Sequence, residues 1–266
     1  LVGSEMCIRD RTPRCIDVMK SVNYIAAEDT RNTVKLLNHF NIEAKLISHH
    51  EHNLHVAIPK LLSLLEEGEP VALVSDAGYP AISDPGYEMV LATIDAGYNV
   101  VPLSGCNACL DALVVSGIAP QPFMFYGFLS HTNKNKTKEL EKLKNITYTI
   151  VFYEAPHRIK ATLECMMKVL GDRRIALCRE ITKKHEEILR GTISEVLEVV
   201  DELKGEMVIV VEGGAEVTEE VTFDQTITEH VDEFVGKGMS KKDAIKEVAK
   251  IRKLNKNLVY EEYHKK

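Results

Sequence analysis

The sequence lacks an apolar run long enough to cross a lipid bilayer, which takes roughly 18 to 20 residues. Its first residues also lack the basic, apolar and small-residue order of a secretory signal peptide. On these absences we expect neither a membrane protein nor a secreted one. Only six cysteines are spread over 266 residues, too few for a disulfide scaffold, so we expect free thiols and a cytoplasmic protein.

Motifs for metals and nucleotide phosphates are also absent. Cys106 and Cys109 form a CxxC pair, but no second pair accompanies them as a zinc site would require. The stretch at residues 75–86 contains neither GxGxxG nor GxxxxGK[ST]. We therefore expect no metal and no phosphate loop. Four neighbouring histidines lack HExxH spacing and are expected to make polar contacts in a cleft: His49, His50, His52 and His55.

What is present is a globular composition, with 45% hydrophobic and 27% charged residues. Short apolar runs alternate with stretches of helical period, which predicts α/β layers with largely parallel strands. The expected strands span residues 22–27, 44–47, 71–74, 98–101, 123–127, 148–153, 175–178 and 207–211. The expected helices span residues 34–40, 54–67, 87–96, 109–116, 134–143, 158–170, 193–203 and 240–249.

Two prolines within residues 119–122 break a helical stretch and mark a seam between domains. We expect an N-terminal α/β domain over residues 12–119, a second α/β domain over residues 120–214 and a small basic helical module over residues 224–266. Residues 1–11 show no period and join awkwardly to a helical stretch. We expect them to be a non-native start, with the first strand of the domain missing.

The net charge of −7 is unevenly placed along the chain. Residues 237–266 hold ten Lys or Arg and four Asp or Glu, which makes this part +6 and the remainder −13. A basic segment of this kind favours an anionic partner such as nucleic acid. A solvated helical surface explains the same charges, and charge alone does not decide between the two.

Charged clusters directly follow four of the expected strands. In open α/β sheets ligands bind beyond the carboxyl ends of the strands, so these clusters carry more weight than charges elsewhere. Because they are split between the two expected domains, we expect a ligand cleft at the domain interface. Each cluster taken singly is equally well explained as a helix cap or a structural ion pair. The clusters are Glu28-Asp29-Thr30-Arg31, Ser75-Asp76-Ala77-Gly78, Glu154-Ala155-Pro156-His157-Arg158 and residues 179–184.

The second cluster opens a stretch at residues 75–86 that is rich in Gly and Pro. Such a backbone can approach a ligand closely, and Asp84-Pro85 is typical of a helix N-cap followed by a first-turn proline. Its two aspartates argue against a bare phosphate as ligand. A structured turn leading into a capped helix is the alternative.

Together these segments resemble the small-subunit ribosomal RNA cytidine 2′-O-methyltransferases, a branch of the tetrapyrrole methylase superfamily that uses S-adenosylmethionine. The resemblance covers about residues 21–213, and the basic part resembles the family's C-terminal helical module around Ser240-Lys241-Lys242-Asp243-Ala244. The family begins with a strand and a Gly-Thr-Pro-Ile-Gly-Asn-Leu loop, in whose place residues 1–11 stand. The matching segments are Ala27-Glu28-Asp29-Thr30-Arg31, His50-Glu51-His52-Asn53, residues 75–86, Tyr153-Glu154-Ala155-Pro156-His157-Arg158, and Arg179-Glu180 with Thr182-Lys183 and His185-Glu186-Glu187.

The resemblance implies two α/β domains with the methyl donor between them, and commonly a homodimer. It implies in-line transfer of a methyl group from S-adenosylmethionine to the ribose 2′-oxygen of a cytidine in 16S ribosomal RNA, with no metal. Holding the reactants in line is expected to dominate the rate enhancement. The partner it implies is this RNA or the small ribosomal subunit.

The resemblance also assigns roles to residues. The reacting end of the cleft is expected at Glu28, Asp29 and Arg31, with Glu28 or Asp29 as the acceptor of the hydroxyl proton. Donor binding is expected at Ser75, Asp76, Ala77, Gly78, Ile82, Asp84, Pro85, Gly86, Asn107 and Ala108. Substrate binding is expected at His50, His52, Asn53, Glu154, His157, Arg158, Arg179 and Lys183, some of them through RNA phosphates.

Two alternatives stay open at this point. A tetrapyrrole or diphthamide-type methyltransferase would share the fold and the donor, although the segments around Glu28, Glu154 and Arg179 point away from it. A non-catalytic RNA-binding protein would result if loss of the first strand abolished donor binding. Titration with S-adenosylmethionine tests the second alternative, because a non-catalytic protein of this kind would not bind the donor.

Overall fold

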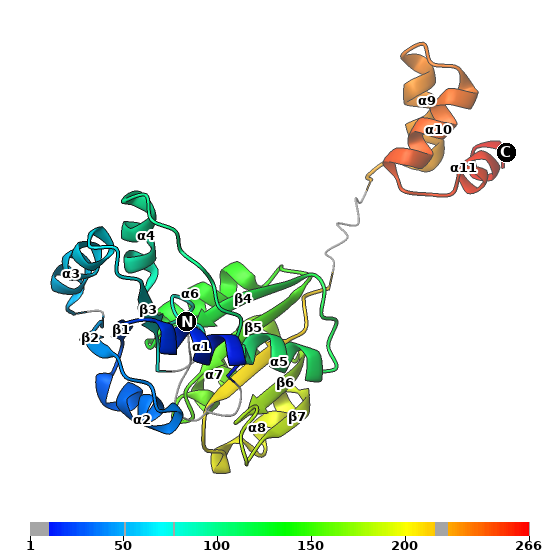
Figure 1. Ribbon diagram of the computed structural model, residues 1–266. Coiled ribbons are helices and arrows are strands. Elements are labelled where there is room, and N and C mark those ends of the chain that lie inside the picture. Colours follow the sequence, from blue (N-terminus) through cyan, green and yellow to red (C-terminus); the bar gives the residue numbers. More distant parts are fainter. Residues whose placement is uncertain (1–10, 51, 77, 216–222, 266) are drawn as a thin grey trace. The chain divides into compact units, whose positions relative to one another are not determined.

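The computed structural model describes residues 11–50, 52–76, 78–215 and 223–265 (Figure 1). The chain forms two compact units, Leu1–Glu216 and Val217–Lys266. The first unit contains two β-sheets with helices around them, and the second consists of helices. The α/β class is thereby confirmed. The expected non-native start lies outside the described residues except for Arg11.

Three parallel strands form the first sheet in the order β2-β1-β3. They are β1 (Tyr24–Ala27), β2 (Lys45–Ser48) and β3 (Val71–Val74). The central strand β1 pairs its last residue, Ala27, with the last residue of each neighbour. The segments after all three strands therefore emerge at the same edge of the sheet, which brings two of the charged clusters together.

Side-chain caps fix the starts of several helices around this sheet. The side chain of Thr12 accepts a hydrogen bond from the backbone N–H of Cys15, and Asp29 and Asn107 cap α2 and α5 in the same manner. The helical stretch expected after residue 11 forms the helix that precedes β1, although no bounds were predicted for it. The helices of this half are α1 (Pro13–Ser21), α2 (Thr30–Phe40), α3 (Leu54–Glu66), α4 (Tyr87–Asp95) and α5 (Ala108–Val115).

The second sheet has five strands in the order β4-β5-β8-β6-β7. Only β4 and β5 pair in parallel, so the prediction of largely parallel strands is wrong for this sheet. The antiparallel strand β8 places Met207, its first residue, opposite both Glu154 and Arg179. The ends of β5 and β6 and the start of β8 therefore share one edge. The strands are β4 (Phe123–Phe128), β5 (Thr149–Glu154), β6 (Arg174–Arg179), β7 (Glu187–Thr192) and β8 (Met207–Val211).

Helices α6 (Asn133–Leu143), α7 (Ile159–Leu170) and α8 (Ile193–Leu197) accompany this sheet, and the largest core cluster joins apolar residues of α6, α7 and α8 to β5, β6 and β8. The helix expected over residues 193–203 is shorter, because α8 ends at Leu197 and a 3₁₀ turn comes after it. Strand β7 was not predicted. It is an edge strand of half-buried, partly polar residues and lacks the apolar run used to find strands.

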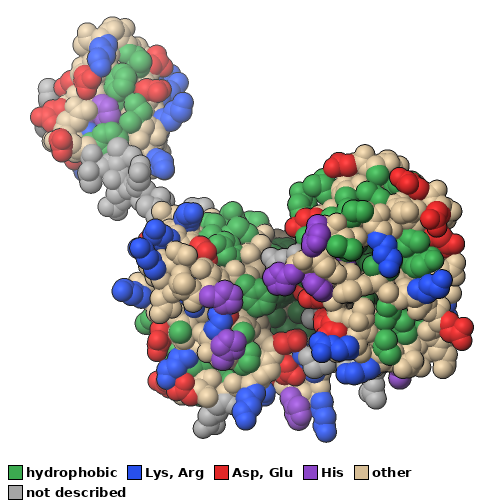
Figure 2. Space-filling model, turned by 90° about the vertical axis from the view of Figure 1, so that its left-hand side faces the viewer, with side chains coloured by type: hydrophobic (Ala, Val, Ile, Leu, Met, Phe, Trp, Pro, Cys, Tyr) green, Lys and Arg blue, Asp and Glu red, His purple; other side chains and the backbone are tan. Residues whose placement is uncertain are grey.

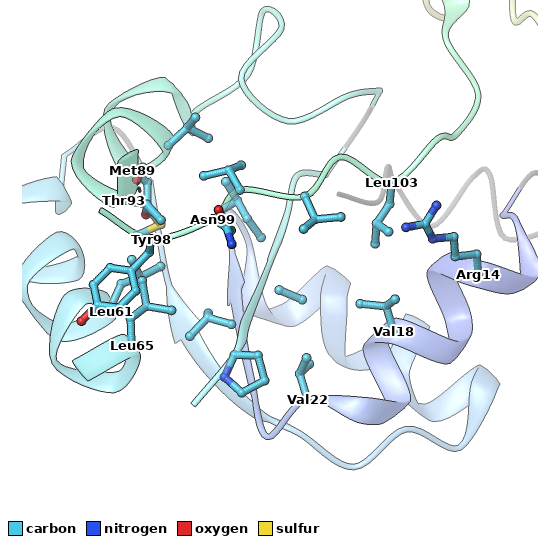
Figure 3. Close-up of a pocket in the computed structure, with 17 residues that line it drawn as sticks. Arg14, Val18, Val22, Leu61, Leu65, Met89, Thr93, Tyr98, Asn99 and Leu103 are labelled. Carbon is cyan, nitrogen blue, oxygen red and sulfur yellow. Dashed lines mark hydrogen bonds between the residues drawn. The ribbon is translucent and has the colours of Figure 1, made fainter. Parts of the chain in front are cut away.

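A cavity of about 420 Å³ lies beside β3 (Figure 3). It is lined by β3, by α1, α3 and α4, and by the segment that contains Tyr98 and Leu103. The strand expected over residues 98–101 is wrong, because this segment joins neither sheet. Within the described residues β3 has β1 as its one ladder partner, and Val100 and Val101 remain exposed across the cavity. A β-prone segment without a ladder neighbour does not form a strand.

The second unit is a helical module of α9 (Ile227–Gly236), α10 (Lys241–Ile251) and α11 (Lys256–His264). Its small core contains Val231, Ile245, Val248 and Val259, each at most 2% exposed. Ser240 caps α10 as the sequence predicts. Among the described residues no helix is long and apolar enough to span a bilayer.

Candidate functional site

Reciprocal hydrogen bonds lock the ends of β1 and β3 together. The carboxylate of Glu28 accepts from the backbone N–H of Asp76 at 3.1 Å, and the carboxylate of Asp76 accepts from the backbone N–H of Asp29 at 3.3 Å. Asn32 donates a further bond to Asp76 at 2.9 Å. The structure thus brings together the first two charged clusters, which lie almost fifty residues apart in the sequence.

Asp29 and Arg31 form a local pair at the start of α2. Asp29 accepts from the backbone N–H of Arg31 at 2.9 Å, and its carboxylate lies 2.6 Å from the Arg31 guanidinium. The hydrogen bonds from Arg31 lower the pKa of Asp29 to about 2. A carboxylate with so low a pKa is a weak proton acceptor near neutral pH. These contacts favour capping for Asp29 over the role of general base.

The loop between β3 and α4 adopts an unusual backbone. Ala81 and Ser83 have positive φ angles of 68° and 61°, which non-glycine residues rarely adopt, and such strain gathers at functional sites. Gly86 has φ 144°, and a Cβ there would lie 3.2 Å from the backbone nitrogen of Ala81. The predicted donor contact at Ala77 lies outside the described residues.

This loop forms one wall of a cavity of about 270 Å³, and the second sheet supplies most of the other. Figure 2 shows the hollow between the two halves of the first unit, with apolar side chains deep inside and His and charged side chains around it. The predicted donor residues Gly78, Ile82, Asp84 and Ala108 line the cavity. Its other lining residues are Ser83, Phe128, Tyr153, Glu154, Ala155, Pro156, Cys178, Ile181, Glu206, Met207 and Val208.

The charged residues that line this cavity are all acidic: Asp84, Glu154 and Glu206. Burial raises the pKa of Asp84 to about 7, and the charges of Glu28 and Asp76 add to the rise, while a hydrogen bond with Ser75 opposes it. Glu154 and Glu206 are paired with Arg158 and Lys183, so Asp84 is the lining acid that has no ion pair among the described residues. An apolar cavity with such a carboxyl suits a cationic ligand with an apolar part. It does not suit a phosphate.

Glu154 and Arg158 form a buried ion pair. Their side chains lie 3.1 Å apart and are 1% and 12% exposed. Glu154 also accepts hydrogen bonds from Thr162 and from the backbone N–H of Ala155 at 2.9 Å, and the buried Lys136 donates to Thr162 at 2.7 Å. Both members of the pair were predicted to bind substrate. Their contacts favour a structural role, and direct substrate contact stays a prediction.

Arg158 in addition ties the end of β4 to this pair. Its guanidinium donates to the carbonyl oxygens of Leu129 and Ser130 at 2.6 and 3.2 Å and contacts His131 at 2.9 Å. The neighbouring His157 is exposed. Of the predicted phosphate contacts in this segment, His157 is therefore the more accessible one.

The fourth cluster is also internally paired. Arg179 pairs with Glu187 at 2.9 Å, and Lys183 lies 3.0 Å from Glu180 and 2.8 Å from Glu206. Burial opposes the charge of Lys183, but these two carboxylates outweigh burial and raise its pKa. Arg179 and Lys183 were predicted to bind substrate. The observed pairs leave these cations largely neutralised.

The histidine-rich segment after β2 lies at the edge where the first two clusters meet. The side-chain oxygen of Asn53 accepts from the backbone N–H of His50 at 2.9 Å, and the rings of His50 and His52 contact edge to face. His49 is fully buried, and burial lowers its pKa. No group of three potential metal ligands occurs among the described residues.

No disulfide joins the described cysteines, which are Cys15, Cys106, Cys109, Cys165 and Cys178. Burial raises the pKa of Cys109 to about 11 and that of Cys178 to about 12. Both therefore remain protonated thiols near neutral pH. A redox pair or zinc ligand at Cys109 has no support in these properties.

Comparison with known proteins identifies the family of this chain. A family model described as Tetrapyrrole (Corrin/Porphyrin) Methylases matches residues 8–197. A Bacillus subtilis (strain 168) protein named Ribosomal RNA small subunit methyltransferase I is 52% identical over 263 residues, 97% of this chain and 90% of that protein. A Halalkalibacterium halodurans protein of the same name is 45% identical, covering 97% of this chain and 91% of that protein. The chain belongs to the tetrapyrrole methylases.

Solved structures of other tetrapyrrole methylases share the fold. A cobalt precorrin-4 methyltransferase superposes with a TM-score of 0.58 at 15% identity, covering 79% of this chain and 90% of that chain. A uroporphyrin-III-C-methyltransferase from Thermus thermophilus gives a TM-score of 0.54 at 17% identity, covering 77% and 88%. The predicted tetrapyrrole methylase fold is therefore confirmed.

Tetrapyrrole methylases use S-adenosylmethionine, and the cavity of this one fits that donor chemically. The bound donor supplies an electrophilic methyl group on a sulfonium cation. The apolar side chains of Ile82, Ile181 and Met207 suit its adenine, and the carboxyl of Asp84 suits a positive group.

Several lining residues of this tetrapyrrole methylase escaped prediction from sequence. Glu206 and Met207 stand at the start of β8, whereas only the ends of strands were searched for site residues. Because β8 runs antiparallel, its first residues reach the edge at which its neighbours end. Had the antiparallel direction of β8 been predicted, Glu206 and Met207 would have been among the candidate site residues.

Proposed function

We propose that this protein methylates the 2′-oxygen of a cytidine in the RNA of the small ribosomal subunit, with S-adenosylmethionine as donor. The observation that supports it most is the likeness to relatives named Ribosomal RNA small subunit methyltransferase I, at 52% and 45% identity over 97% of the chain. The position of the methyl group within the nucleotide is part of the proposal and rests on the sequence resemblance. Location in the cytoplasm and a homodimer belong to the proposal too.

The chain's own residues contribute positioning and proton acceptance in this proposal. The strained loop and the start of β8 hold the donor between the two sheets, and the apolar lining strengthens the field of the carboxylates. With a pKa of about 7, Asp84 is half ionised near neutrality and suited to accept the hydroxyl proton. Glu28 remains the other candidate, since it borders Asp76 at the same edge.

The test follows a labelled methyl group. The protein is incubated with S-adenosylmethionine carrying a tritiated methyl group and with unmethylated small ribosomal subunits, and the RNA is digested to nucleosides. We expect label in 2′-O-methylcytidine. Label on a base would support RNA methylation but would show that the methyl group does not go to the 2′-oxygen. Label on a uroporphyrin or precorrin, with none in RNA, would replace the proposal by tetrapyrrole methylation.

A further inference from the structure

The helical module carries a basic cavity of about 320 Å³ between α10 and α11. No Asp or Glu of the described part of the chain lines it. Its floor is apolar, because Ile245 is 2% exposed and belongs to the core of the module. The lining residues are Lys241, Lys242, Ile245, Lys256, Tyr260 and His264.

The three lysines of this cavity differ from other lysines of the module. Lys237, Lys246 and Lys265 each lie within 3.7 Å of a carboxylate, those of Glu233, Asp243 and Glu262. The cavity lysines have no ion pair within 4.0 Å among the described residues. Lys250 and Lys253, which do not line the cavity, also have no such pair among the described residues. What sets the cavity apart is that three uncompensated lysines line one hollow together.

Helix stability does not explain the position of the cavity lysines. Lys241 and Lys242 are the first two residues of α10, and Lys256 is the first residue of α11. Cations in the first turn oppose the helix dipole and cost stability. The nearby carboxylate of Asp243 bonds to Ser240 and pairs with Lys246, so it does not offset this cost fully. A bound anion would do so.

An aromatic surface adjoins the lysines. Tyr260 is 52% exposed, and its ring lies 4.3 Å from that of His264, centre to centre, in an edge-to-face contact. Exposed aromatic rings beside uncompensated lysines are the elements with which proteins hold single-stranded nucleic acid, because bases stack on the rings while lysines contact phosphates. The apolar floor at Ile245 adds a surface for a base.

We infer that this cavity binds a single-stranded segment of RNA, with Lys241, Lys242 and Lys256 at phosphates and Tyr260 against a base. The inference rests on the proposed function, because the RNA of the small subunit is the substrate there. It adds an RNA-binding site on the module, remote in sequence from the donor cavity. The site would increase the affinity of the protein for RNA and would take no part in methyl transfer.

The test compares two triple variants of the full chain in binding a short fluorescein-labelled single-stranded RNA by fluorescence anisotropy. One variant carries Lys241→Gln, Lys242→Gln and Lys256→Gln. The matched control carries Lys237→Gln, Lys246→Gln and Lys265→Gln and removes the same charge from the same unit. We expect the cavity variant to bind about tenfold more weakly at low salt, with its log–log salt slope shallower by about 2. The control variant should stay near wild type.

A second pair of variants tests the ring. Tyr260→Ala should weaken RNA binding by about 5- to 150-fold, whereas Tyr260→Phe should retain it, because stacking needs the ring and not the hydroxyl. Circular dichroism melting of each variant shows whether the module is folded. Equal weakening by both lysine triples, or wild-type binding by the cavity triple, would overturn the inference.

The two proposals fail separately. If wild-type protein binds the RNA probe through the cavity but transfers no methyl group to the small subunit, the proposed function is wrong and the RNA site stands. If methyl transfer to RNA occurs while the cavity triple binds probe and subunits as wild type does, the module site is wrong and the proposed function stands.

Discussion

The charged side chains at the edges of the two sheets of the first unit have different partners. At the second sheet Glu154 pairs with Arg158, and Lys183 lies between Glu180 and Glu206. At the first sheet burial raises the pKa of Asp84 to about 7, and the nearby charges of Glu28 and Asp76 add to the rise. The paired charges of the second sheet hold strands in place, as do the hydrogen-bonded carboxylates of Glu28 and Asp76 at the first sheet. Asp84, with its raised pKa, is the acid available for chemistry.

The strongest test of this difference removes a paired charge. Glu154→Ala leaves Arg158 and Thr162 without their buried carboxylate partner, so the free energy of unfolding should fall by about 3 to 5 kcal/mol. Urea denaturation measures the loss. Glu187→Ala, which removes the 42%-exposed partner of Arg179, is the control and should cost about 1 kcal/mol or less. Similar losses in both variants would contradict a structural role specific to Glu154.

The next test removes an uncompensated acid. Asp84→Asn should lower kcat for methyl transfer by about 10²- to 10⁴-fold, because the amide cannot accept the hydroxyl proton. The wild-type rate should rise with pH through about 7, where Asp84 loses its proton, and the variant should lack that rise. Asp95→Asn, at the exposed end of α4, is the control. Unchanged kcat in Asp84→Asn would remove Asp84 from the mechanism.

The raised pKa of Asp84 also predicts a smaller effect, on how the free energy of unfolding depends on pH. The folded protein holds Asp84 protonated up to about pH 7, whereas an unfolded aspartate loses its proton near 3.8, so wild-type stability should fall as pH rises between these values. Asparagine does not titrate, so in Asp84→Asn the fall in the free energy of unfolding over this pH range should be smaller by about 1 to 2 kcal/mol, a figure reduced for solvent screening. Thermal melts at about pH 5 and about pH 8 measure the difference. A variant with the wild-type pH dependence would contradict the burial of this carboxyl.

The smallest structural effect is expected at Arg31. Its side chain is 87% exposed and contacts Asp29 of the same turn, so Arg31→Gln should leave the urea midpoint unchanged. If Arg31 meets an RNA phosphate, KM for small subunits should rise while kcat stays similar. A loss of stability comparable with that of Glu154→Ala would show that the two sheets do not differ as described.

Much of the fold and part of the site were predictable from sequence. The strands at residues 71–74 and 207–211 and the cap at Ser240 are found as predicted, because apolar runs and capping residues act locally. Strand direction in the second sheet depends on long-range pairing that no local pattern encodes, and Glu206 was missed for that reason. Glu154 and Arg158 were placed correctly at the edge, and an ion pair between them was one of the two interpretations that the sequence left open. The sequence alone did not decide between that pair and substrate binding.

The cavity beside β3 has a consequence for how copies of this protein meet. A row of backbone N–H and C=O groups that has no ladder partner within the described ranges, next to uncovered valines, is a template onto which a strand of another chain can add. Native proteins protect edge strands with lysine, proline, bulges or very short strands. The sequence of β3, Val-Ala-Leu-Val, has none of the first three, so its length of four residues is the protection it offers. If a strand of another chain adds to this edge, the association grows with protein concentration, and light scattering over a dilution series measures it.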